Sequence, residues 1–266
     1  MRAINAVIPY FDIATFHIAG LTFHTFGLLV ALGTIAGHAV LSHRAKQIGE
    51  GPPSRIDMFV LCVFVGGYFF GHVFDVLAYH PELVARDPKE LFMLHHGLSS
   101  FGGVAGAFIG GLSYIYAKKL DPWVYTDLCT YSFPFGWIFG RAGCAIAHDH
   151  KGRLTESWLA VRFPEGPRYD LGLIEWLFVP FLCVLTVWLG HRTRRPGAVS
   201  GALAVTYALI RFPLDYLRAT DLGTESDVRH LGLTPGQWAC FVTFAFGLWA
   251  LNHARTHAAP DAPVRA

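Results

Sequence analysis

Charged residues are scarce in this sequence. Aspartate, glutamate, lysine and arginine make up 15% of the 266 residues, whereas hydrophobic residues make up 53%. Soluble domains carry about 25% charged residues, so this chain cannot cover a water-facing surface in the ordinary way. The formal net charge is only +2, and the sequence has no basic tract. These features argue against a soluble domain and give no support to nucleic-acid binding.

Cysteine is also sparse, and its positions suit neither disulfide bonds nor a zinc site. The five cysteines are Cys62, Cys129, Cys144, Cys183 and Cys240, and all of them fall inside apolar runs. An odd, unclustered set disfavours both a disulfide framework and a zinc site. The sequence also lacks an internal repeat and a pair of broken helices, which disfavours a transporter.

Long apolar runs dominate the sequence instead. Stretches of about 17–25 apolar residues recur, the length that an α-helix needs to cross about 30 Å of hydrocarbon. We count seven spans, at about 21–41, 57–79, 98–117, 122–147, 171–190, 199–217 and 237–253. We therefore predict an all-α integral membrane protein.

The loops between the spans predict its orientation. The loop HRTRRPG is rich in arginine and is therefore expected on the cytoplasmic side, which places the N-terminus outside and the C-terminus in the cytoplasm. Pro9 and Asp12 interrupt the apolar core that a cleavable signal peptide needs, so we expect residues 1–20 to form an interfacial arm. We predict one membrane domain over residues 1–256 and a short cytoplasmic tail at 257–266.

Two segments have predictable structural roles. Gly102, Gly106 and Gly110 recur at four-residue spacing in the third span, which predicts a close approach between two helix backbones. The outer loop 148–170 is polar and rich in arginine, glutamate, glycine and proline. We expect this long loop to be a mobile cover over a site.

Two arginines lie inside apolar runs. Arg141 follows thirteen residues without a formal charge, and Arg211 lies in AVTYALIRFPLDYL. A cation in such a stretch costs about 3 kcal/mol to insert, so it normally faces a partner or a polar cavity. Arg141 has no carboxylate three or four residues away, so its partner is a ligand or lies on another helix, and this absence favours a ligand. Glu175 in the fifth span could pair with either arginine, and an anionic lipid phosphate is the leading ligand.

A polar stripe surrounds Arg211. Tyr207, Arg211 and Asp215 are spaced i, i+4 and i+8, so they share one helix face with Arg218. Pro213 removes a backbone hydrogen bond and predicts a kink there. This stripe is either a cavity wall or an interhelical ion pair between Arg211 and Asp215.

The segment His148-Asp149-His150 permits several interpretations. A histidine beside a carboxylate can act as a general base, which suggests His148 with Asp149. Cys144 and His148 are four residues apart and could form a nucleophilic dyad, although a packing role for Cys144 is the favoured interpretation. His-x-His supplies only two metal ligands, so a metal site is disfavoured.

With these residues in hand, the chain resembles the bacterial prolipoprotein diacylglyceryl transferase family over nearly its full length. The resembling segments are IPYFDIATFHIAGLTFHTFGL, HHGLSSFGGVAGAFIGG, GRAGCAIAHDHKGR, YALIRFPLDYLRATD and LTPGQWACFVTFAFG, with Glu175 in RYDLGLIEWLF. GRAGCAIAHDHKG lies where that family has a signature that begins Gly-Arg-x-Gly-Asn. The residues that match are Arg141, Gly143, Gly152, Glu175, Tyr207 and Arg211.

The sequence also departs from the family pattern. Cys144 and Ala147 stand where the family has asparagines, and Asp149 stands where it has glutamate. Phe26 replaces a tyrosine of the first span, and Phe101 replaces a histidine or tyrosine of the third. The chain is therefore identified as a diverged member.

The resemblance implies a reaction. A diacylglyceryl group moves from phosphatidylglycerol to the lipobox cysteine thiol of a prolipoprotein, in the bacterial inner membrane, without metal or organic cofactor. Arg141, Gly143, Glu175 and Arg211 are expected to bind phosphatidylglycerol. His148, Asp149, Arg211 and Tyr207 are expected to be catalytic, with His148 and Asp149 as the base.

Two alternatives stay open. The replacements at Phe26, Phe101 and Cys144 are compatible with a phospholipid-binding paralogue that has lost turnover. A Cys144–His148 dyad would instead make the protein an acyltransferase or a lipid hydrolase.

Overall fold

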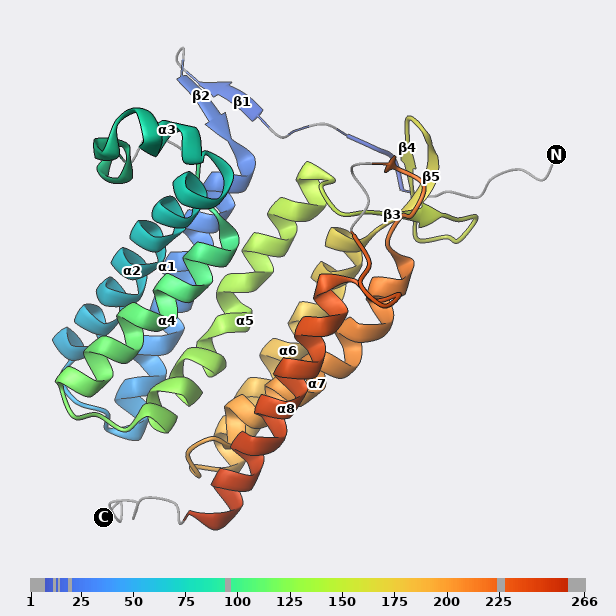
Figure 1. Cartoon of the computed structure of the whole chain (residues 1–266). Helices are drawn as coiled ribbons and strands as arrows, with labels where there is room; N and C mark the ends of the chain where they lie inside the picture. Colours follow the sequence, from blue (N-terminus) through green and yellow to red (C-terminus); the bar gives the residue numbers. More distant parts are fainter. Residues whose placement is uncertain are drawn as a thin grey trace. The chain divides into compact units, whose positions relative to one another are not determined.

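The computed structural model describes residues 8–11, 13, 15–18, 21–93, 97–223 and 228–257. Its long helices are α1 (Thr25–Ile48), α2 (Pro53–Tyr79), α4 (Ser100–Ala117), α5 (Pro122–Ala147), α6 (Leu171–Arg192), α7 (Ala198–Leu214) and α8 (Pro235–Thr256) (Figure 1). Every predicted span falls on one of them. The tail from residue 258, much of the predicted arm, and His95 and His96 lie outside the described residues.

The prediction of an all-α fold is wrong for two short segments. Strands β1 (Thr15–Ile18) and β2 (Leu21–His24) pair antiparallel before α1, so helix α1 begins four residues later than the predicted span. The expected loop at 148–170 contains strands β3 (Lys151–Leu154), β4 (Ala160–Phe163) and β5 (Gly166–Asp170). They form an antiparallel sheet in the order β3-β5-β4.

Three further elements are short. Helix α3 (Pro81–Arg86) and a 3-10 turn η1 (Pro88–Phe92) connect α2 to α4. A second 3-10 turn, η2 (Asp215–Leu217), follows α7 directly, two residues after Pro213. The chain therefore leaves its helical path at the polar stripe where the proline predicts a kink.

Length and composition mark three of the described helices as able to cross a membrane. These are α1, α2 and α6, at Thr25–Ile48, Pro53–Tyr79 and Leu171–Arg192. Residues Phe101–Ala117 of α4 form a shorter apolar helix. The orientation predicted from the loops stays a prediction.

The chain separates into two compact units. One comprises residues 41–125, and the other comprises residues 1–40 and 126–266. Extension of a single membrane domain over residues 1–256 stays a prediction.

In the unit of residues 41–125, helices α2 and α4 pack backbone to backbone. A Cβ atom built on Gly106 would lie 2.2 Å from the carbonyl oxygen of Gly66, and one on Gly110 would lie 2.1 Å from that of Cys62. No side chain fits at such distances, so glycine is required for this approach. The close packing predicted for the glycines of the third span is confirmed.

In the other unit, Asp127 of α5 holds the start of α7. Its carboxylate accepts hydrogen bonds from the backbone nitrogen of Gly197 at 2.9 Å and from that of Ser200 at 2.8 Å. The Ser200 hydroxyl donates a third, at 2.7 Å. These bonds satisfy backbone donors that a helix start leaves without intrahelical partners, and they fix α7 against α5. Helices α6, α7 and α8 run side by side in this unit (Figure 1).

Candidate functional site

Glu175 is a fully buried carboxylate that two arginines share. Its Oε2 lies 2.8 Å from Nη2 of Arg141, and its Oε1 accepts a hydrogen bond from Nη1 of Arg211. The three side chains come from three different helices, α6, α5 and α7. The pairing of Glu175 with an arginine is confirmed, and Glu175 pairs with both. The sequence favours a ligand as the partner of Arg141, whereas the structure gives it Glu175, a residue of another helix.

The charge network continues beyond Arg211 through Asp215. The Oδ1 atom of Asp215 lies 2.6 Å from Nη2 of Arg211 and 3.0 Å from Nε of Arg218. Its Oδ2 accepts a hydrogen bond from the Thr234 hydroxyl. The structure thus contains the ion pair between Arg211 and Asp215, which is one of the two alternatives that the sequence leaves open. The pair forms at i, i+4 along one stretch of chain and not between two helices.

The described part of this network contains three arginines and two carboxylates. The arginines are Arg141, Arg211 and Arg218, and the carboxylates are Glu175 and Asp215. Glu175 holds the guanidinium groups of Arg141 and Arg211 close together. A planar guanidinium group can donate paired hydrogen bonds to phosphate oxygens, so this arrangement suits an anionic group such as a phosphate.

Trp137 connects Tyr207 to the arginine network. Its ring meets that of Tyr207 edge-on, with centroids 5.2 Å apart. The guanidinium carbon of Arg141 lies 5.2 Å from the Trp137 ring centroid, a cation–π distance. Trp137 thus helps to orient Arg141. The sequence analysis did not single out Trp137.

Gly143 is a packing position in this structure. A Cβ atom built on it would lie 2.7 Å from Cδ2 of Phe26, so the bare backbone of α5 lets the Phe26 ring approach. The predicted contact of Gly143 with phosphatidylglycerol stays a prediction. Phe101, the other aromatic replacement, is exposed on α4.

The predicted pair of His148 with Asp149 is wrong. The Nδ1 atom of His148 lies 2.6 Å from Oδ2 of Asp170, whereas Asp149 lies 3.5 Å from Nδ1 of His150. His148 follows the last residue of α5 and has a φ of 51°. This left-handed turn ends α5 at Ala147. Residues four apart share a face only inside a helix, so Cys144 and His148 are not expected on one face. The alternative of a Cys144–His148 dyad is not formed in the described residues, because His148 Nδ1 pairs with Asp170 and its Nε2 has no hydrogen-bond partner there.

His148 lines an apolar cavity of about 190 Å³. The other lining residues are Ile8, Phe11, Ala142, Ala145, Ile146, Val161, Leu173 and Trp176. The residue is 6% exposed, and its buried Nε2 has no hydrogen-bond partner in the described part of the chain. Tyr10 stacks on the imidazole at 4.6 Å, and Phe163 meets it edge-on at 5.3 Å. The ring is therefore held firmly, with one nitrogen available to a ligand.

Asp170 has two roles, and the sequence analysis missed both. Its Oδ1 accepts a hydrogen bond from the backbone nitrogen of Leu173, which caps α6, while its Oδ2 holds His148. Burial raises the pKa of this carboxyl, although the hydrogen bond from His148 acts in the opposite direction. An aspartate immediately before an apolar helix is an N-cap signal that could have revealed the first role.

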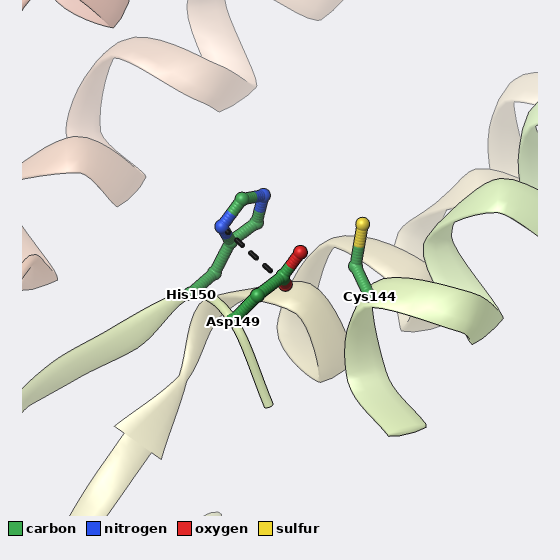
Figure 2. Close-up of side chains that lie close together, drawn as sticks. All are labelled: Cys144, Asp149 and His150. Atoms are coloured by element: carbon green, nitrogen blue, oxygen red, sulfur yellow. Dashed lines mark ion pairs between the residues drawn. The ribbon is translucent and has the colours of Figure 1, made fainter. Parts of the chain in front are cut away.

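Cys144, Asp149 and His150 lie together at the end of α5. Figure 2 shows the Asp149 carboxylate between the imidazole of His150 and the thiol of Cys144, with the three side chains on one side of the chain. Their possible ligand atoms all lie within 4.8 Å of one another.

Comparison with known proteins identifies the chain. A family model described as prolipoprotein diacylglyceryl transferase matches residues 13–253. The chain belongs to this family. Its members named below are transferases, and the family is a membrane family, in agreement with the apolar helices.

Several members named phosphatidylglycerol–prolipoprotein diacylglyceryl transferase are similar over most of their length. The protein from Nitratidesulfovibrio vulgaris is 30% identical over 263 residues, which are 96% of this chain and 98% of that protein. The protein from Solidesulfovibrio magneticus is 30% identical over 257 residues, 92% of this chain and 95% of that protein. The protein from Mannheimia succiniciproducens is 30% identical over 220 residues, 80% and 82% of the two chains.

Proposed function

We propose that this transferase moves a diacylglyceryl group from phosphatidylglycerol to the lipobox cysteine of a prolipoprotein. The names of the relatives supply the two substrates. The observation that carries the proposal is the buried Glu175 carboxylate, which holds the guanidinium groups of Arg141 and Arg211 close together. We place the enzyme in the bacterial inner membrane with seven spans, its N-terminus outside and its C-terminus in the cytoplasm.

The reaction needs a thiolate, because the thiol itself is a weak nucleophile. His148 is assigned as the base: Asp170 fixes its Nδ1, so the free Nε2 takes the proton of the acceptor thiol. The thiolate sulfur then attacks the glyceryl carbon that carries the phosphate. A carbon–sulfur bond forms, the carbon–oxygen bond to phosphate breaks, and the oxygen keeps the bonding electrons.

Glycerol phosphate leaves with that additional negative charge. Arg141 and Arg211 are assigned to stabilise it, since arginine stays charged and can donate paired hydrogen bonds to phosphate oxygens. Glu175 is a positioning residue that keeps both guanidinium groups in place. Tyr207 acts through Trp137, whose ring also contacts Arg141.

The test is a transfer assay in phosphatidylglycerol micelles with a lipobox peptide, followed by mass spectrometry of the peptide. The peptide cysteine should gain a diacylglyceryl mass, and Arg141→Ala should lower the rate about 10²–10³-fold. Arg153→Ala, which removes an exposed arginine of β3, is the matched control and should keep the rate. An Arg141→Ala enzyme with the wild-type rate would refute the assignment.

A second candidate is phospholipid binding without turnover. It is favoured by Phe26, whose ring lies against Gly143 where the family resemblance expects a tyrosine hydroxyl. The same assay separates the two functions. Phosphatidylglycerol that co-purifies and requires Arg141, with no change in peptide mass, would support the binding protein.

A further inference from the structure

Cys144, Asp149 and His150 bring three different metal-ligating groups to one place. Cys144 lies in the last turn of α5, and the other two residues lie between α5 and β3. The thiol, carboxylate and imidazole donors lie within 4.8 Å of one another, and Asp149 Oδ1 is 3.5 Å from His150 Nδ1. None of the cysteines forms a disulfide, so the Cys144 sulfur can bind a ligand.

We propose that these three residues bind a thiophilic divalent cation of the zinc class. Sulfur and imidazole donors favour zinc or cadmium over magnesium and calcium, which prefer oxygen ligands. Zinc bonds to sulfur, nitrogen and oxygen are about 2.0–2.3 Å long, so tetrahedral ligands lie about 3.3–3.8 Å apart. The side chains therefore need to close by only about 1 Å, and Asp149 is exposed enough to move.

The charges of the site also suit a dication. Binding requires the thiolate form of Cys144, so the metal replaces one thiol proton. The thiolate and the Asp149 carboxylate together neutralise the two positive charges of the ion. This neutrality matters because Arg141 Nη1 lies 3.9 Å from the Cys144 sulfur, where an unneutralised dication would be repelled. Three protein ligands leave the fourth position of a tetrahedral ion to water.

The structure also explains why the sequence disfavours this site. The motif His148-Asp149-His150 presents two histidines, but the left-handed turn at His148 sends its imidazole to Asp170. The remaining His150 then faces the thiol of the preceding helix end (Figure 2). The third ligand is thus Cys144, and the ligand spacing follows no familiar zinc pattern.

The experiment is a cadmium titration of the purified full chain in detergent micelles. Cadmium is the probe because its bond to a thiolate absorbs in the ultraviolet, and the readout does not depend on transferase activity. We expect one cadmium ion per chain, this absorption band, and release of about one proton per ion. An excess of zinc should compete with cadmium for the site, whereas an excess of magnesium should not.

Variants decide whether these three residues form the site. Cys144→Ser should abolish the absorption band. His150→Gln and Asp149→Asn should each weaken cadmium binding at least about tenfold, because loss of a residue that only hydrogen-bonds to a metal ligand already lowers metal affinity by about that factor. Cys183→Ser and His191→Gln remove a thiol and an imidazole of α6 and should bind like the wild type. Unfolding temperatures without metal verify that each variant is folded.

Three results would overturn the proposal. The first is a wild-type protein that does not bind cadmium, and the second is an absorption band that persists in Cys144→Ser. The third is an unchanged cadmium affinity in both His150→Gln and Asp149→Asn. If Cys144→Ser does not fold, the two other variants still decide, because their side chains lie on the segment that follows the helix. If the peptide assay shows no diacylglyceryl transfer, the outcome of the cadmium titration still decides whether the metal site exists.

Discussion

The Nδ1 atom of His148 lies 2.6 Å from Oδ2 of Asp170, and both residues are buried. This contact assigns the tautomer: with the Nδ1 proton directed at the carboxylate, Nε2 keeps its lone pair and can accept a proton. Asp170 thus determines which nitrogen of His148 is the base, although the two residues lie 22 positions apart in the sequence.

Asp170→Asn tests this relationship. We expect about a 10²-fold lower transfer rate and a changed pH profile, because a neutral amide does not stabilise the His148 imidazolium as the Asp170 carboxylate does. Asparagine is also a good N-cap, so α6 should keep its stability. The matched control is Asp127→Asn, which alters the carboxylate at the start of α7 and should keep the pH profile. Identical profiles in Asp170→Asn and wild type would remove Asp170 from the mechanism.

Glu175→Gln should damage both stability and activity. The substitution leaves Arg141 and Arg211 buried without their shared carboxylate, and breaking a buried pair costs about 3–5 kcal/mol. Thermal unfolding in micelles measures the loss. The control is Glu165→Gln, which removes an exposed pair with Lys151 and should cost less than about 1 kcal/mol. Equal losses of stability in Glu175→Gln and Glu165→Gln would contradict the role of Glu175 in holding the two arginines.

Gly106→Ala should loosen the pair of α2 and α4. The added methyl group would meet the carbonyl oxygen of Gly66 at 2.2 Å, so the backbones must separate, at a cost of about 1–3 kcal/mol. In Gly27→Ala the added methyl group has nothing within 4 Å. This control should be neutral or stabilising, because alanine is the better helix former. Unfolding temperatures of the two variants provide the comparison.

Acid should release the segment that follows η2. Arg168 donates two hydrogen bonds to Asp221, at 2.9 and 2.6 Å, and they lower the pKa of that carboxyl. Because the folded pKa lies below the unfolded value of about 3.9, this stabilisation is present above about pH 4 and is lost as the pH falls through the folded pKa.

Amide exchange of Asp221 and its neighbours, measured against pH, tests this prediction. Protection should fall at acid pH in the wild type. In Asp221→Asn it should already be low and independent of pH, since the amide forms no ion pair with Arg168. The same acid dependence in both proteins would show that another group is responsible.

Sequence patterns predicted the features that depend on local spacing. The apolar runs marked every long helix, and the i, i+4 spacing of Arg211 and Asp215 made their ion pair one of two alternatives. Glu175 could be proposed as the partner of either arginine because a carboxylate in an apolar span needs a cation, but the sequence could not show that it binds both.

The features that sequence patterns did not predict depend on backbone turns and on tertiary contacts. The left-handed conformation of His148 changes which side chains meet at the end of α5. Histidine is enriched in this conformation, but it adopts it too rarely for the residue type alone to predict it. The strands at 148–170 are four or five residues long, and their regularity comes from pairing with β5. Such short strands carry little periodic signal.

Two bridges connect the adjoining ends of α5 and α6: Arg141 to Glu175, and His148 to Asp170. Each uses one residue from the α5 end and one from the start of α6, so together they fix the register between the two helices. A slide of either helix along its axis would break both bridges at once. The proposed phosphate clamp and the proposed base are therefore mechanically coupled, and a substrate that moves one of them must move the other.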